Sequence, residues 1–124
     1  MIAADTSSLA SFLKGETGNA VDKVAAALAA GNLILPSVVI TEILSDPASA
    51  KLLDRVISEI ETLEIEEGFW TRAGRSRRTV RQHALKATIA DTLIAQSCID
   101  HDVALITGES DFRHFAKHCG LKLA

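Results

Sequence analysis

Several residue types that mark special classes of protein are scarce in this sequence. Tyrosine is absent and aromatic residues make up 4% of the chain, so the core must be aliphatic. Only two cysteines are present, and the opening residues reach a charge at Asp5 without a basic start, so we expect reduced thiols, no secretory leader and a cytoplasmic protein. No apolar run approaches the ~20 residues needed to cross a bilayer, so no membrane insertion is expected.

What the sequence does contain suits one compact domain. Hydrophobic residues make up 48% of its 124 residues, and alanine, leucine, isoleucine and valine recur throughout. We therefore expect a single domain over residues 1–124. The formal net charge of −3 gives no overall attraction to nucleic acid, so a surface for a polyanion would have to come from local clustering.

Apolar segments at 1–4, 33–35, 62–65 and 103–106 are predicted strands, and helical patterns lie between them. This alternation predicts an α/β domain with three layers, in which helices cover both faces of a mostly parallel sheet. We also expect a helix capped by Asn19, a helix from Asp46 to Ile60, a helix over 66–86 and a last strand over 121–123. In such sheets ligands collect beyond the carboxyl ends of the strands.

Three acids, Asp5, Glu42 and Asp91, each stand alone inside a short apolar run. A carboxylate withdrawn from water is costly unless a cation or several donors compensate it, so these acids suggest a shared divalent metal. Carboxylates without histidine or cysteine partners suit Mg²⁺ or Mn²⁺. Helix capping is an alternative use of Asp5 and of Asp91, which follows Thr88 in a T-x-x-D pattern, whereas Glu42 has no such explanation.

The order of four motifs resembles the PIN-domain ribonucleases, and most closely the VapC-type toxins of toxin–antitoxin pairs. These motifs are I-A-A-D-T-S-S-L, T-E-I-L, I-A-D-T-L-I-A and A-L-I-T-G-E-S-D-F. The resemblance implies an endoribonuclease that uses Mg²⁺ or Mn²⁺ to hydrolyse RNA phosphodiester bonds. It places Asp5, Glu42 and Asp91 in the catalytic metal site. Asp111 is the preferred fourth ligand and Glu109 the alternative, while Thr6 and Thr107 would orient the ligands.

The resemblance also implies partners: an RNA substrate, a cognate antitoxin that blocks the acidic groove, and a second copy bound through apolar helix faces in the first half of the chain. A basic stretch without acids, which holds five of the 13 lysine and arginine residues, would bind RNA phosphates. Its members are Arg72, Arg75, Arg77, Arg78 and Arg81. Antitoxin docking is a competing use, and a plain solvated helix face is the ordinary one.

Two other functions remain open on the sequence alone. The same acids could serve a Mg²⁺-dependent phosphohydrolase of a small phosphate ester. A catalytically silent PIN-like binding module is the other alternative, because Glu109 stands where many members of the family have aspartate or asparagine.

Overall fold

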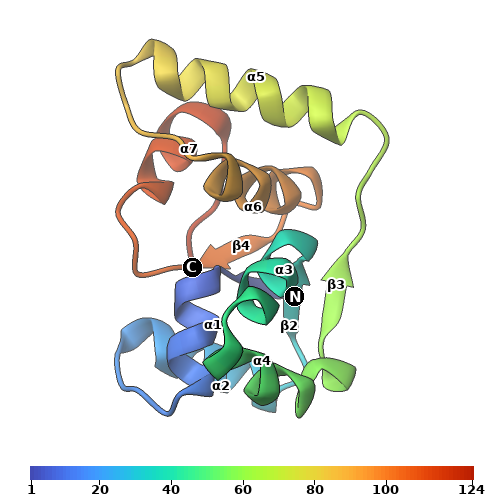
Figure 1. The fold of residues 1–124 in the computed structure, drawn as a ribbon. Coiled ribbons are helices and arrows are strands. Elements are labelled where there is room, and N and C mark those ends of the chain that lie inside the picture. The colour runs from blue at the N-terminus through green and yellow to red at the C-terminus, as the bar shows by residue number, and fades with distance from the viewer.

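A parallel sheet of four short strands lies at the centre of the computed structural model, which describes residues 1–124 (Figure 1). The strands are β1 (Ile2–Ala4), β2 (Leu33–Pro36), β3 (Glu61–Leu63) and β4 (Ala104–Ile106), in the order β3-β2-β1-β4. Every pairing is parallel, and Ile2 lies opposite both Leu33 and Ala104. The predicted α/β fold is confirmed. The carboxyl ends of all four strands therefore meet at one edge of the sheet.

Helices connect the strands and flank the sheet. They are α1 (Thr6–Leu13), α2 (Asn19–Ala29), α3 (Ser37–Ser45), α4 (Pro47–Asp54), the 3-10 turn η1 (Ile57–Glu59), α5 (Phe69–Gln82), α6 (Ile89–Asp100) and α7 (Phe112–Cys119). Figure 1 shows α5 across one end of the molecule, where it packs on α6 and α7, while α1, α2 and α4 lie at the opposite end. None of these helices is long and apolar enough to cross a membrane.

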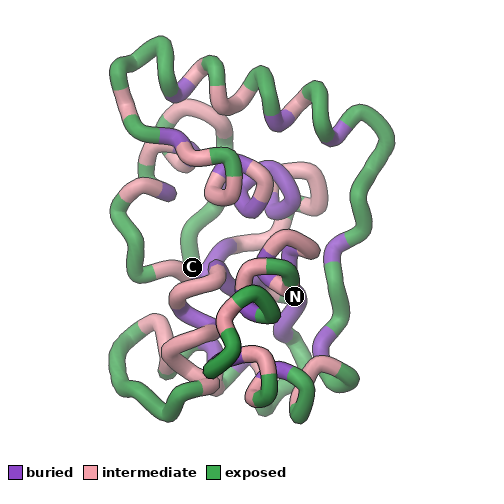
Figure 2. The backbone as a smooth tube through the Cα atoms, viewed as in Figure 1, coloured by how far each residue is buried: buried purple, intermediate pink, exposed green.

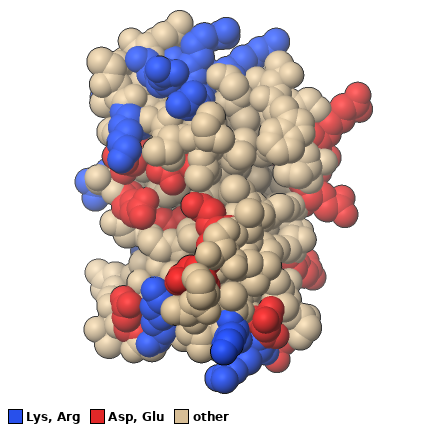
Figure 3. Space-filling view, in the orientation of Figure 1, with Lys and Arg blue, Asp and Glu red and all other residues tan.

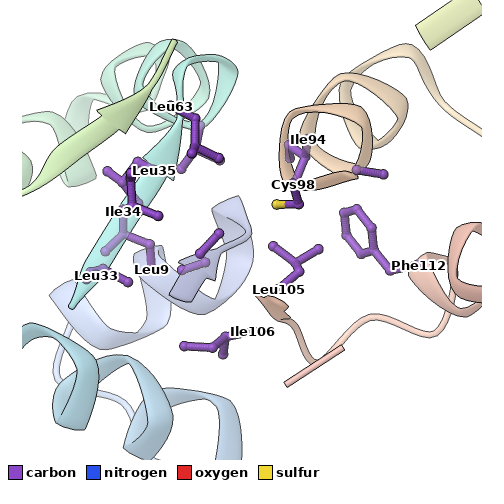
Figure 4. Close-up of a cluster of buried hydrophobic side chains, with 14 of the residues drawn as sticks. Leu9, Leu33, Ile34, Leu35, Leu63, Ile94, Cys98, Leu105, Ile106 and Phe112 are labelled. Atoms are coloured by element: carbon purple, nitrogen blue, oxygen red, sulfur yellow. The ribbon is translucent and has the colours of Figure 1, made fainter. Parts of the chain in front are cut away.

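One cluster of 23 buried apolar residues joins the sheet to the helices (Figures 2 and 4). Leu35 on β2, Leu9 on α1 and Leu105 on β4 are fully buried in it, together with Phe112 at the start of α7. The core is aliphatic apart from a few phenylalanines, as the composition predicts. Because strands and helices share this core, the strand ends are held in fixed positions relative to the helices that follow them.

The ends of several elements differ from the sequence prediction. The helix that begins at Pro47 ends at Asp54, and η1 separates it from β3, which begins one residue earlier than expected. The helix predicted over 66–86 covers only Phe69–Gln82, because left-handed backbone stands on both sides of it, with φ at 83° for Gly68 before its start and at 57° for Ala84 after its end. The expected strand over 121–123 is reduced to a single bridge between Leu105 and Leu123. Asn19 does not cap α2; it is the first residue of that helix.

Candidate functional site

Four carboxylates line a single cavity of about 200 Å³ beyond the carboxyl ends of the strands. They come from four elements: the end of β1 supplies Asp5, α3 supplies Glu42, the first turn of α6 supplies Asp91, and the loop after β4 supplies Glu109. Thr6, Ser7 and Ile94 complete the lining. Figure 3 shows acidic side chains gathered across the middle of this face, below the basic residues at the α5 end. The structure thus brings the three acids singled out in the sequence together.

Asp5 is held at the bottom of this site by three donors. Its side chain is buried, with 1% of the residue exposed, and it accepts hydrogen bonds from Ser8 N at 2.9 Å, Thr107 Oγ1 at 2.6 Å and Ser7 Oγ at 3.3 Å. The bond from Ser8 N makes Asp5 the N-cap of α1. The carboxylate of Asp5 therefore caps α1 through Oδ1 and is held in the site through Oδ2. Ser7 is a contributor that the sequence analysis missed, although its place two residues after the first acid is a usable signal.

Two threonines connect the acids to the scaffold by hydrogen bonds. Thr6 Oγ1 donates to Glu42 Oε1 at 2.6 Å and so joins α1 to α3. Thr107 Oγ1 donates to Asp5 and accepts from Glu109 N at 3.0 Å, which ties the loop after β4 to the end of β1. Hydroxyl groups of this kind fix the orientation of a carboxylate without adding charge.

Asp91 lies in the most negative part of the site. Partial burial raises the pKa of its carboxyl group, and the nearby charges of Glu109, Asp111 and Glu42 raise it further, against a lowering effect of the Thr88 hydroxyl. Thr88 Oγ1 accepts from Asp91 N at 3.1 Å and caps α6. The cap uses the backbone of Asp91, so its carboxylate remains available to the cavity.

The two candidates for the fourth acid lie in different surroundings. Glu109 lines the cavity, whereas Asp111 lies outside the lining. The carboxylate of Asp111 is 3.7 Å from Lys86 Nζ and 3.7 Å from His114 Nε2. Glu109, the alternative fourth ligand, thus shares the cavity with the other three acids, while Asp111, the preferred one, lies close enough for its charge to raise the pKa of Asp91. The shorter side chain of Asp111 is held by α7 and Lys86 instead.

The donor set of the cavity fits a hard divalent cation. All its polar lining atoms belong to carboxylates, hydroxyls and backbone, and no lysine or arginine lines it. No three acidic, histidine or cysteine side chains converge closely enough to hold one ion together. Mg²⁺ does not require this, because it keeps several waters and is usually held by one or two carboxylates and by substrate phosphates. One or two of Asp5, Glu42, Asp91 and Glu109, together with waters, would therefore hold it.

The five arginines of α5 fall into two groups. Arg72 forms a bidentate ion pair with Asp100, with Nε–Oδ1 at 2.9 Å and Nη2–Oδ2 at 2.7 Å, and its Nη1 donates to Glu67 O at 2.8 Å. The hydrogen bonds from Arg72 lower the pKa of Asp100. Arg72 is therefore part of the scaffold, not a free phosphate ligand as the sequence suggested.

Three of the other four arginines line a second cavity, of about 460 Å³, on α5. It is lined by Arg77, Arg78 and Arg81, with Ile89 from the start of α6. Arg77 also donates from Nε to Ala87 O at 2.8 Å, which holds its guanidinium near the loop before α6. The charged groups of Arg78 and Arg81, and that of Arg75 outside the cavity, form no ion pair or hydrogen bond within the chain, so they are free to bind an anion.

Comparisons with known proteins agree with this architecture. The VapBC2 complex of Rickettsia felis bound to a DNA fragment from their promoter contains a chain of the same fold, with a TM-score of 0.76 and 21% identity over 100% of this chain and 98% of that chain. FitAcB from Neisseria gonorrhoeae gives a TM-score of 0.70 and 16% identity over 99% of this chain and 96% of that chain. No curated protein matches the sequence. The family model described as PIN domain matches residues 2–118. The match covers nearly the whole sequence, so this chain belongs to the PIN domain family.

Proposed function

We propose that this protein is a metal-dependent endoribonuclease that uses Mg²⁺ or Mn²⁺, and that it is the toxin of a toxin–antitoxin pair. The observation that carries the proposal is that four carboxylates line one cavity and that no lysine or arginine side chain lines it. These carboxylates belong to Asp5, Glu42, Asp91 and Glu109. PIN domains are generally nucleases, which supports a reaction at a phosphodiester bond. The compartment we propose for this activity is the cytoplasm.

Each residue of the site has a distinct task in this proposal. A divalent ion held at these carboxylates would supply a water of lowered pKa and positive charge beside the phosphate. Asp5 provides a rigid carboxylate because three donors fix it, and Thr107 sets the position of Glu109 relative to Asp5. Asp91 contributes a carboxylate whose pKa is raised by burial and by the charges of Glu109, Asp111 and Glu42, so a cation beside it would be favourable.

The arginine-lined cavity on α5 suits the backbone of the substrate. Arg78 and Arg81 lack partners within the chain, and lysine and arginine contacts to phosphates supply most of the affinity of nonspecific nucleic-acid binding. Such contacts position the RNA without reading its sequence. Antitoxin docking at the same arginines is the competing use.

An antitoxin and a second copy of the chain are the protein partners we propose. One solved structure of the same fold is named as a VapBC2 complex, which supports an antitoxin. An apolar cavity of about 230 Å³ between α3, α5 and α6 is lined by Val38, Ile65, Phe69, Trp70 and Leu93. Trp70 is 66% exposed and Ile65 is 44% exposed, so apolar area remains for protein contacts at this cavity.

The decisive experiment compares RNA cleavage by purified, antitoxin-free protein in Mg²⁺, Mn²⁺ and EDTA. Asp91→Asn and Glu109→Gln should abolish or strongly reduce cleavage, whereas Asp54→Asn, which removes an exposed acid from the end of α4, should not. Asp5→Asn belongs in the set with a thermal melt, because its three hydrogen bonds make it a folding risk.

Three results would count against the nuclease. Cleavage that persists in EDTA or in Asp91→Asn would reject the metal site. RNA binding without cleavage by a folded protein would favour the silent binding module. Turnover of a small phosphate ester that is insensitive to Arg78→Glu would favour the phosphohydrolase.

A further inference from the structure

Trp70 lines two cavities, and one of them has no place in the function proposed so far. This second cavity has a volume of about 220 Å³ and lies between α5 and the first turns of α6, which pack on each other (Figure 1). Trp70, Gly74 and Arg77 line it from α5, and Ile89 and Leu93 line it from α6. We call it the indole cavity. Its surface is mostly apolar, apart from the guanidinium group of Arg77.

The indole cavity is continuous with the arginine-lined cavity on α5. Gly74, Arg77 and Ile89 line both of them. Trp70, Gly74, Arg77 and Arg81 follow one another at intervals of four, three and four residues, so they lie on one face of α5. Gly74 has no side chain, and a Cβ at its position would have open space around it. A chain bound at the arginines can therefore extend along α5 to the indole of Trp70.

The ring of Trp70 is exposed and at the same time oriented by a buried neighbour. The residue is 66% exposed, although a large apolar side chain gains free energy when it is buried. Its indole packs on the ring of Phe69 in a T-shaped arrangement, with ring centroids 5.0 Å apart and ring planes at 84°, and Phe69 is 2% exposed. Such a contact uses at most one face of the indole. Aromatic surface of fixed orientation is thus left for a ligand.

Positive charge without a counter-charge borders this aromatic surface. Arg77 lines both cavities, and its Nε donates to Ala87 O, while its two Nη groups form no hydrogen bond or ion pair within the chain. No aspartate or glutamate lines either cavity. Proteins that bind single-stranded nucleic acid combine a positively charged groove for the backbone with aromatic rings on which bases stack. Trp70 and the arginines place both components on one face of α5.

We propose that Trp70 stacks on an unpaired base of the RNA whose phosphates bind in the arginine-lined cavity. This inference rests on the proposed function and narrows its substrate to RNA that is unpaired at this site, because bases inside a duplex do not offer their faces to a side chain. The start of α6 links the two sites, since Leu93 lines the indole cavity and Asp91 lines the acidic cavity. The arginines without counter-charge favour a polyanion over a purely apolar protein surface, which is the other occupant that the test covers.

The intrinsic fluorescence of the protein reports on Trp70 alone, because the chain has one tryptophan and no tyrosine. Unpaired RNA is titrated into the Asp91→Asn variant, in which cleavage does not obscure binding, and the emission of the indole is followed. We expect unpaired RNA to quench this emission by stacking. Inorganic polyphosphate carries the charge of RNA without its bases, and duplex RNA carries it with the bases paired. Both probes should bind at the arginines and leave the emission nearly unchanged.

Substitutions in the same background separate the ring from its apolar area, with affinity measured by anisotropy of a labelled RNA. Trp70→Leu keeps an apolar side chain but removes the ring, so the affinity for unpaired RNA should fall roughly 5- to 150-fold, the range for loss of one base–aromatic stack. Its affinity for polyphosphate should not change. Trp70→Phe keeps a ring and should recover most of the affinity. The matched control is Ile65→Ala, which removes a 44% exposed apolar side chain that borders Trp70 in the other cavity only.

Emission that does not change at saturating unpaired RNA, while the wild type cleaves RNA, would overturn the inference and leave the proposed function intact. The titration uses no variant of Trp70, so it decides the matter even if Trp70→Leu fails to fold. Equal quenching by polyphosphate would also overturn the inference, because no base would be needed. An equal loss of RNA affinity in Ile65→Ala, or a Trp70→Leu variant that changes only the oligomeric state in sedimentation, would assign the indole to a protein contact. A protein that neither binds nor cleaves RNA would reject the proposed function and the inference with it.

Discussion

Substitution of Thr107 by Val tests whether one hydroxyl group connects Asp5 to the loop that carries Glu109. Valine keeps the shape of the side chain but removes the donor to Asp5 Oδ2 at 2.6 Å and the acceptor for Glu109 N at 3.0 Å. Asp5 is 1% exposed, so water cannot replace the lost donor without rearrangement of the site. We therefore expect loss of both stability and activity.

The size of the effect follows from the two bonds. A hydrogen bond to a charged acceptor contributes about 1.5–3 kcal/mol, and one between neutral partners about 0.5–1.5 kcal/mol. The free energy of unfolding should therefore fall by about 3 kcal/mol, which lowers the melting temperature of a domain of this size by roughly 10–15 °C. RNA cleavage by the fraction that remains folded should fall as well, because Glu109 loses its connection to Asp5.

Urea unfolding and single-turnover RNA cleavage measure the two effects, with Thr107→Ser as the control. Serine retains the hydroxyl, so both quantities should stay close to those of the wild type. If Thr107→Val unfolds at the same urea concentration as the wild type, the bond from Thr107 to Asp5 contributes nothing and the reasoning is refuted. A Thr107→Ser variant as damaged as Thr107→Val would show that the methyl group, not the hydroxyl, matters.

Three further predictions concern charge. Asp91→Asn should reduce cleavage by more than the roughly 10- to 100-fold typical of outer ligands, yet leave the melting temperature unchanged or raised, because it relieves repulsion with Glu109. The pKa of Asp91 is raised in the folded protein, so its contribution to stability should fall as the pH rises above its ordinary pKa. Cleavage should increase over the same interval, because the carboxylate becomes ionised. Melting temperatures and cleavage rates of the wild type and Asp91→Asn, measured over a pH series, test both expectations. Arg72→Gln should lower the melting temperature and leave RNA affinity intact, because it leaves the 7% exposed side chain of Asp100 without its ion-pair partner. Arg78→Gln should lower RNA affinity and leave the melting temperature intact. Anisotropy measures the affinity, and thermal melts measure the stability.

The fold could be predicted from the sequence because each strand and the helix after it carry local signals. The apolar run before Asp5, the Pro36–Ser37 junction and the Thr88 cap all mark elements that the structure contains. Element ends were harder to place, because tertiary contacts decide them. The helix from Pro47 stops at Asp54 although apolar residues continue, and Ile60, directly before β3, is buried in the core instead of extending the helix.

The acids of the site were identifiable, but their partners were not. A sequence shows that Asp5 can cap α1; it does not show that Thr107, which is 102 residues away, donates to the same carboxylate. The choice between Glu109 and Asp111 likewise depends on the path of one loop and on Lys86, which lies outside the motif. The sequence does not show that Arg72 differs from the other arginines of its stretch, because its ion-pair partner, Asp100, is 28 residues away.

The capping and functional interpretations of the first motif are not alternatives, because the start of α1 serves both. Successive helical side chains point about 100° apart, so four consecutive residues face different surroundings. Asp5 accepts the cap bond and lines the acidic cavity, Thr6 donates to Glu42, Ser7 donates to Asp5, and Ser8 supplies the backbone N–H of the cap. The D-T-S-S motif at the end of β1 therefore begins a helix and orients two acids of the site with the same four residues.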